Sequence, residues 1–348
     1  MSIANGQLLD LANQCLQGLD AVQPTEEKSK ALATRLDYVR TVNGLLRQAK
    51  TNERGLLEVM QDTGRPSTFY KRLAALRYFC FVRMDALLVD LRRFVGEGTV
   101  DGLAVQFSEL LQQVQVLVCL QQQGMTKERR KKRSKRQALT GLPSDWRTLL
   151  CRRGGAGKYG QALLVSSLTG ARPNELVSGV EILQQHDEVL RQDVIHFKLM
   201  GAKVKDKQGQ PVRVISYASN DSNPLVVALV ELLRRDSIKG RLFVQIENAA
   251  NFTVEIRRLA KSLWPKHRQA VTAYCFRHQW SADLKAAGDG DAVSRGLGHM
   301  SAKTRRHYGT AGQSRSSDRL RPVHIDAARP IKGLNMMVPV TSLGSSRP

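Results

Sequence analysis

The sequence contains few aromatic residues and few acids, and its cysteines follow no motif. Aromatic residues make up 5% of the 348 residues, and no two cysteines form a CxxC pair. The five cysteines are scattered along the chain: Cys15, Cys80, Cys119, Cys151 and Cys275. An odd, scattered set argues against a disulfide framework and against a structural zinc site, and it favours a reducing compartment.

Long apolar runs are also missing. No run approaches the ~20 apolar residues of a membrane-spanning helix. The N-terminus lacks the basic start and apolar core of a signal peptide. We therefore expect a cytoplasmic protein with no membrane partner.

The shortage of acids leaves a strongly basic chain. Lysine and arginine number 54 against 31 acidic residues, a formal charge of +23. Such a balance favours a polyanionic partner, and nucleic acid is the commonest one. The length exceeds that of a usual single core, so two domains are expected.

The first third of the sequence predicts helices alone. Leucines recur at helical spacing in residues 5–19, 26–49 and 67–95, and no alternating pattern interrupts them. We therefore predict a helical domain over residues 1–124, and the basic composition of the chain makes this domain a candidate for DNA binding. Residues 127–136, KERRKKRSKR, hold eight basic residues in ten and no apolar one. This run predicts a basic linker over 125–140, with a nuclear-import signal as the other interpretation.

The remainder predicts a mainly α domain with a small antiparallel β-sheet, over residues 141–315. Residues 193–200 alternate, and 211–217 are expected to pair with them in a hairpin with a basic tip. Helices are predicted around this hairpin, and residues 316–348 are expected to form a mostly loose C-terminal tail.

The stretch LTGARPNEL, residues 168–176, is the first candidate for chemistry. Pro173 suits the first turn of a helix, which places Arg172 at the N-terminal rim, where an anion is favoured. Glu175 is then placed to hold the guanidinium group. A capped helix with a surface arginine explains this motif equally well.

The stretch YCFRHQW places Tyr274, Arg277 and His278 on one face of a helix, at i, i+3 and i+4. The stretch LGHMSAKTRRHYG, residues 297–309, then sets His299 and Tyr308 among basic side chains. Alone, the first is explained by a half-buried arginine and the second by a solvated helix face.

Together the three stretches resemble the catalytic domain of the tyrosine recombinases, the phage-integrase family. They resemble the first-arginine box, the HxxRH box with its helix-ending glycine, and the LGH box with the nucleophilic tyrosine. The two arginines lie 105 residues apart, His299 follows Arg277 by 22 residues, and Tyr308 follows His299 by nine. The resemblance covers about residues 145–312.

This resemblance implies a site-specific recombinase, such as the integrase or resolvase of a mobile element, that uses no cofactor. It implies cleavage and rejoining of DNA through a 3′-phosphotyrosyl intermediate. The expected partners are double-stranded DNA with specific recombination sites, further copies of the chain in a tetramer on paired sites, and an accessory DNA-binding protein as a candidate. The expected location is the nucleoid of a bacterial host.

The chemistry fits these residue types. Arg172 and Arg277 are suited to clamp a phosphate with forked donors, and His299 to donate a further hydrogen bond. Tyr308 would attack the phosphorus. A phenol, with a pKa near 10, becomes an effective nucleophile when nearby cations lower that value.

One position departs from the family pattern. The family usually has histidine where this chain has Tyr274, the expected base and later acid, and a phenol is a weaker base near pH 7. His278 and His307 are candidates to compensate. The departure keeps open a non-catalytic, sequence-specific DNA-binding protein on the same scaffold; a type IB topoisomerase-like relaxase is the alternative enzyme.

The family also places a general-acid lysine in the hairpin between the arginine boxes. Lys203 matches that position best, while Lys205 and Lys207 lie further out and are expected to touch the DNA backbone. The linker adds five candidates for the same backbone contact: Arg129, Arg130, Lys131, Lys132 and Arg133.

Overall fold

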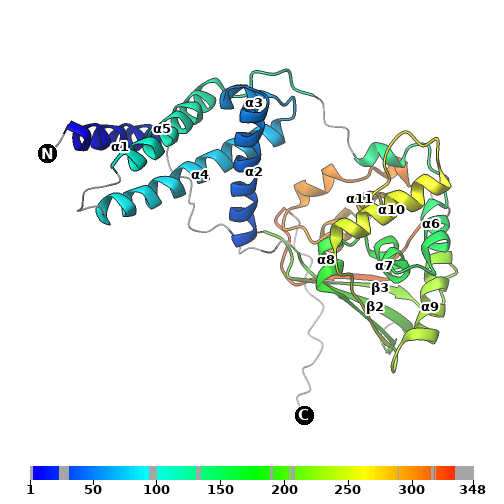
Figure 1. Ribbon diagram of the computed structural model, residues 1–348. Helices are drawn as coiled ribbons and strands as arrows, with labels where there is room; N and C mark the ends of the chain where they lie inside the picture. Colours follow the sequence, from blue (N-terminus) through cyan, green and yellow to red (C-terminus); the bar gives the residue numbers. More distant parts are fainter. Residues whose placement is uncertain are drawn as a thin grey trace, which may run out of the picture. The chain divides into compact units, whose positions relative to one another are not determined.

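The computed structural model describes residues 3–22, 31–93, 100–130, 135–188, 191–202, 204, 208–288, 290–314, 317 and 319–333. The chain divides into two compact units, residues 1–132 and 133–348, called here the N-terminal and C-terminal units (Figure 1). It is mainly helical with a small antiparallel sheet, as the sequence predicts.

The described part of the N-terminal unit is helical. Its helices are α1 (Ile3–Ala21), α2 (Leu32–Thr51), α3 (Leu56–Gln61), α4 (Pro66–Arg93) and α5 (Val100–Gln123). Apolar residues at helical spacing, such as Phe69, Leu76 and Cys80 of α4, form one buried core with those of the other helices. The helices that the sequence predicts for this part of the chain are therefore present.

One helix of this unit is more apolar than the sequence analysis allows. Within the described residues, Gly102–Gln123 of α5 is the one segment long and apolar enough to cross a membrane. However, Phe107, Leu110 and Leu117 of this helix lie in the core of the unit, where α5 packs on α1 and α4. A core helix passes the same test of length and composition, so this finding is compatible with a soluble protein.

Described residues at both ends of the predicted basic linker, 125–140, belong to the two units. At its start, the amide N–H of Arg130 donates to the carbonyl of Gly64 at 2.8 Å, and Lys127 pairs with Asp62 at 2.7 Å. At its end, residues Lys135–Leu139 form a 3-10 helix, η2, whose Ala138 is buried in the C-terminal unit. The prediction missed the second of these ends because Ala138 and Leu139 are too few to form a recognisable pattern, and it missed the first because contacts with residues far back in the chain leave no mark in a basic run.

The C-terminal unit surrounds a five-stranded antiparallel sheet in the order β4-β1-β2-β3-β5. The strands are β1 (Val180–Asp187), β2 (Gln192–Met200), β3 (Val212–Ala218), β4 (Arg241–Val244) and β5 (His324–Ala327). The helices are α6 (Trp146–Gly154), α7 (Gly160–Thr169), α8 (Pro173–Ser178), α9 (Pro224–Asp236), α10 (Ala249–Leu263), α11 (Ala273–Ala286) and α12 (Gly290–Gly296). Two further 3-10 helices are η3 (Ala302–His307) and η4 (Ala311–Gln313).

The predicted hairpin is confirmed as β2 and β3, whose alternate side chains face the helices. Ile195 of β2 pairs with Tyr217 of β3, and both are buried. The Tyr217 hydroxyl donates to the carbonyl of Leu168 in α7 at 2.6 Å and accepts from Trp280 Nε1 in α11 at 3.2 Å. The sheet, α7 and α11 are thereby joined in one core (Figure 1).

Part of the C-terminal tail, which the sequence analysis expects to be mostly loose, is held by the rest of the C-terminal unit. Within residues 316–348, the described segment 319–333 includes β5, which pairs with β3, and Lys332, which forms a bridge with Ser301. Leu320 is buried, and its N–H points to Asp283, which forms a fully buried ion pair with Arg147 at 2.8 Å. A four-residue strand held by such distant partners leaves no periodicity for sequence analysis to detect.

Candidate active site

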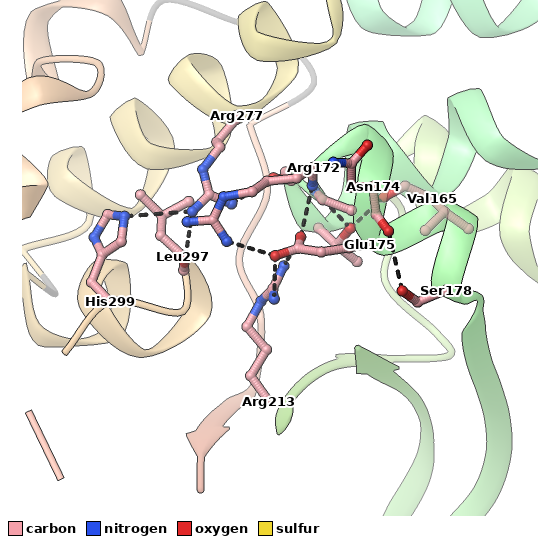
Figure 2. Close-up of polar contacts among 12 residues, drawn as sticks. Val165, Arg172, Asn174, Glu175, Ser178, Arg213, Arg277, Leu297 and His299 are labelled. Carbon is pink, nitrogen blue, oxygen red and sulfur yellow. Dashed lines mark hydrogen bonds and ion pairs between the residues drawn. The ribbon is translucent and has the colours of Figure 1, made fainter. Parts of the chain in front are cut away.

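Helix α8 places Arg172 and Glu175 as the sequence predicts. Pro173 occupies the first helical position and Arg172 the N-cap. Glu175 Oε2 accepts from the backbone N–H of Arg172 at 2.7 Å, and Oε1 accepts from Arg172 Nη1 at 2.6 Å. The carboxylate therefore fixes both the backbone and the side chain of this arginine (Figure 2).

The site contains a third arginine that the sequence analysis missed. Arg213 of β3 is 1% exposed and donates to both Glu175 oxygens, from Nη1 at 3.1 Å and from Nη2 at 2.7 Å. It pairs with the buried Leu199 of β2, and its side chain lies on the same face of the sheet as that of the buried Ile215. Its alternation with Ile215 and Tyr217 becomes a signal of burial only once the register of β3 against β2 is known.

Arg277 of α11 joins the three motifs that sequence analysis treats separately. Its Nη1 donates to the carbonyl of Gly170 at 3.0 Å, and its Nη2 donates to the carbonyl of Leu297 (Figure 2). Gly170 ends α7 with φ 59°, and a Cβ there would meet Trp280 Cβ at 3.3 Å and Arg277 Cα at 3.2 Å. The glycine thus allows both the left-handed turn and the close approach of α11.

His299 lies against Arg277, with its Nε2 at 3.5 Å from Arg277 Nη2. Burial, together with the charges of Arg277, Arg172 and Arg213, lowers the pKa of His299 to about 2. The ring is therefore neutral at physiological pH. Since a guanidinium only donates, Nε2 is the acceptor and the ring proton is on Nδ1. Among the described residues, this buried Nδ1 has no hydrogen-bond partner.

Tyr308 follows η3 and packs its ring between two histidines and over an arginine. The ring centroids of His299 and His278 lie 5.1 and 5.3 Å from that of Tyr308, and Arg277 Cζ lies 5.1 Å from it. Burial alone raises the pKa of the phenol, but the charges and hydrogen bonds of Arg277 and Arg172 outweigh burial, so the pKa lies below its ordinary value.

The cluster carries an excess of buried positive charge. In the ion pairs that the described residues form, Arg172 and Arg213 share Glu175, whereas Arg277 donates to carbonyls. Three guanidinium charges minus one carboxylate leave two positive charges. Burial raises the pKa of Glu175, but Arg213, Arg277 and Arg172 bring it to about 2, so the carboxylate stays ionised. An uncompensated charge of this kind calls for an anionic ligand.

The other predicted residues of this region lie at different depths. Tyr274 is 41% exposed and lies near enough to Arg172 for an ionised phenol to influence that arginine. His278 is buried beside Tyr308, and burial and neighbouring cations lower its pKa to about 4. His307 is exposed at the end of η3. Of these two histidines, His278 is therefore the one that is buried against the phenol of Tyr308.

The predicted DNA-contacting residues are only partly described. Arg129 and Arg130 are exposed in the N-terminal unit. Six candidates lie outside the described residues: Lys131, Lys132, Arg133, Lys203, Lys205 and Lys207.

The described residues contain no group of three or more His, Cys, Asp or Glu side chains arranged to hold a metal ion. Comparison of the chain with models of protein families, with curated proteins and with solved structures gives no match. The side chains of the cluster are therefore the basis of the functional assignment.

The buried neutral histidine predicts a loss of stability in acid. Unfolded chains bind a proton at His299 below about pH 6.5, whereas the folded chain resists protonation down to about pH 2. Falling pH thus favours unfolding, and the share of His299 between pH 7 and pH 5 is about 2 kcal/mol. Between pH 7 and pH 5, the free energy of unfolding should therefore fall by about 2 kcal/mol less in His299→Gln than in the unsubstituted chain.

Urea unfolding followed by tryptophan fluorescence measures this difference, because Trp146, Trp264 and Trp280 all belong to the C-terminal unit. Equal pH dependence of the two chains would show that the folded chain binds a proton at His299 as readily as the unfolded one.

Proposed function

We propose that the chain is a tyrosine-type site-specific DNA recombinase that cleaves and rejoins DNA through a 3′-phosphotyrosyl intermediate. The observation that carries the proposal is a phenol packed on Arg277, in a cluster of three arginines of which two, Arg172 and Arg213, share the one carboxylate of Glu175. A phosphodiester is an anion that such a cluster is suited to bind.

The arrangement suits the demands of the reaction. The Tyr308 hydroxyl gives its proton to a base, for which Tyr274, His278 and His307 are the candidates, and its oxygen attacks phosphorus. The bond from phosphorus to the 5′ oxygen breaks, and that oxygen leaves with a proton from the general acid. Negative charge grows on the non-bridging oxygens, and Arg172 and Arg277 supply preorganised donors for it. We propose that His299, which lies against Arg277, adds a further hydrogen bond to the phosphate.

The cations also favour the nucleophile. Because Arg277 and Arg172 lower the pKa of Tyr308, less free energy is needed to form the phenolate than for a free tyrosine. Rejoining follows the same path in reverse, since the phosphotyrosyl bond conserves the energy of the broken one. The 5′ hydroxyl of a DNA strand then attacks and releases Tyr308.

Double-stranded DNA with specific sites is the proposed partner, bound by a tetramer of the chain on two paired sites, in the cytoplasm of a bacterial cell. The formal charge of +23 and the exposed Arg129 and Arg130 support contact with phosphates. An integrase or resolvase of a mobile element is the biological role that we propose.

Capture of a covalent adduct tests the proposal without knowledge of the target site. The chain is incubated with a library of nicked duplexes made from the genome that encodes it, so that the short fragment beyond the cleaved bond diffuses away and rejoining fails. Adducts that survive detergent are digested to the peptide carrying the nucleotide, and the attached DNA is sequenced. We expect one enriched sequence attached to the peptide with Tyr308.

The outcomes separate the candidate functions. Selective binding of one sequence without an adduct would contradict the enzyme and favour the non-catalytic DNA-binding protein, to which the exchange of histidine for Tyr274 points. An adduct whose formation leads only to relaxation of supercoiled DNA, with no need for a second site, would favour the topoisomerase-like alternative.

The source of the leaving-group proton is predicted to be Lys203. An alkoxide leaves poorly without a proton, whereas a thiolate leaves unaided because thiol pKa values lie near 8.5. Lys203→Ala should therefore be nearly inactive on ordinary DNA and regain cleavage on DNA with sulfur at the bridging 5′ position. Single-turnover adduct formation on the captured sequence measures this rescue.

Lys205→Ala and Lys207→Ala serve as matched controls, since each removes one lysine from the same hairpin and should lose only salt-dependent affinity. If sulfur instead rescued Tyr274→Phe and not Lys203→Ala, Tyr274 would be the general acid.

A further inference from the structure

The segment that carries Tyr308 is fastened to α11 at its backbone as well as at its phenol. Lys285, in the last turn of α11, donates from Nζ to three carbonyls: Arg305 at 2.9 Å, Tyr308 at 3.3 Å and Gly309 at 2.6 Å. An ammonium group has three protons, so this one side chain can give one to each carbonyl. Charge-assisted bonds of this kind are stronger than neutral ones.

The same segment approaches α11 more closely than a side chain permits. A Cβ on the buried Gly309 would lie 2.1 Å from the carbonyl oxygen of His278 and 3.1 Å from Cβ of Ala282. Glycine at this position therefore brings the backbone after Tyr308 directly against the helix. This close packing is independent of the Lys285 hydrogen bonds and fixes the backbone at Gly309, the residue that follows Tyr308.

Both attachments of the Tyr308 segment are made to the same helix, α11. Arg277 and Lys285 lie eight residues apart on one helix, roughly 12 Å along its axis. Arg277 lies beneath the phenol, and Lys285 holds the main chain of the same tyrosine. A rigid helix thus fixes both ends of the nucleophilic residue relative to the arginine that is proposed to bind the phosphate.

We propose that Lys285 is a positioning residue that, together with the close packing of Gly309, holds Tyr308 in line with the phosphate bound by its own chain. This inference rests on the proposed function. Lys285 does not touch the reacting atoms; it acts through the backbone of Tyr308. Misplacement of a reacting group by about 1 Å costs roughly 100-fold in rate, so loss of this attachment should lower cleavage on that scale.

The first experiment needs no DNA and reports the position of the phenol. The full chain is labelled with 3-fluorotyrosine, and the fluorine resonance of Tyr308 is assigned by its loss in Tyr308→Phe. In Lys285→Met, which keeps the length of the side chain but removes its donors, the resonance should move toward that of free fluorotyrosine. The phenol should also titrate at a higher pH, because it lies farther from Arg277 and Arg172.

Gly309→Ala should give the same two changes by steric displacement, with Lys285 intact. The chain offers a matched control for each variant. Lys261, in the last turn of α10, donates to the carbonyl of Pro265 at 2.6 Å. A Cβ on Gly312 would have no atom within 4 Å. Lys261→Met and Gly312→Ala should leave the Tyr308 resonance unchanged.

The second experiment measures single-turnover adduct formation on the captured DNA sequence. Lys285→Met and Gly309→Ala should be slower by roughly 100-fold, while their affinity for the DNA equals that of Lys261→Met and Gly312→Ala. If Lys285→Met does not melt cooperatively, Lys285→Arg is used in its place. The planar guanidinium cannot donate to the three carbonyls as the ammonium does, so the Tyr308 resonance should change in the same direction.

An unchanged Tyr308 resonance in the folded Lys285 and Gly309 variants would overturn the proposal, and so would a moved resonance with normal adduct formation. If the resonance moves as expected but the unsubstituted chain forms no adduct with any DNA, the placement of the phenol by Lys285 stands and the proposed function fails.

Discussion

Tyr308→Phe is expected to form no covalent adduct with DNA while it binds the captured sequence with unchanged affinity. The substitution removes one hydroxyl and leaves the ring, which packs between His278 and His299 and over Arg277. The arginines that are proposed to bind the phosphate keep their contacts with Glu175. The loss should therefore be confined to the nucleophilic step, and detergent-resistant adduct measures that step directly.

Tyr159→Phe is the matched control, because this tyrosine lies in the same unit and packs on Phe252, away from the arginine cluster. It should form adduct at the rate of the unsubstituted chain. An adduct on Tyr308→Phe would assign the nucleophile to another residue, and mass analysis of the linked peptide would show whether it is the exposed Tyr274.

The local parts of the fold were predictable because each follows from a pattern within a few residues. Pro173 as the first helical residue predicted α8 and the placing of Arg172 beside Glu175, and the structure has both. The alternation of Ile195, Phe197 and Leu199 predicted β2. One cluster brings together four residues that lie far apart in the sequence: Arg172, Arg277, His299 and Tyr308. Their spacing along the chain predicts this cluster only through the resemblance to a family.

Features that depend on tertiary contacts were not predictable in this way. Arg213 is recognisable as buried only when the register of β3 against β2 is known, because a basic residue near a strand end is ordinarily solvated. Lys285 resembles any lysine in the last turn of a helix until η3 is brought to it. The short strands β4 and β5 each span four residues, too few for an alternating pattern to stand out.

Arg172→Lys and Arg277→Lys are expected to bind DNA and to form adduct more slowly by a factor of about 100 or more, since loss of a transition-state donor costs about 3 kcal/mol. An ammonium group is a point donor that cannot replace a planar fork. Arg172 uses Nη1 for Glu175, whereas Arg277 uses both Nη atoms for the carbonyls of Gly170 and Leu297. Arg277→Lys should therefore show the greater loss of the two.

The two lysine variants should also differ in their response to pH. Burial and the charge of Arg172 lower the pKa of Arg277 to about 10, so the guanidinium remains charged at neutral pH. The same burial and the same neighbouring charge would lower the pKa of a lysine at this position below its ordinary value of about 10.4. Residual adduct formation by Arg277→Lys should thus fall as the pH rises toward the alkaline end of the range, because the ammonium loses its proton and its charge.

Arg172→Lys keeps the neighbouring carboxylate of Glu175, which holds the ammonium in its charged form, and should show no such fall. Rates of adduct formation between pH 6 and pH 9, with DNA affinity measured at each pH, separate the two variants. The same pH response in Arg172→Lys and Arg277→Lys would mean that burial does not govern the charge at position 277. Near-normal rates of adduct formation in both variants would place the phosphate away from these arginines.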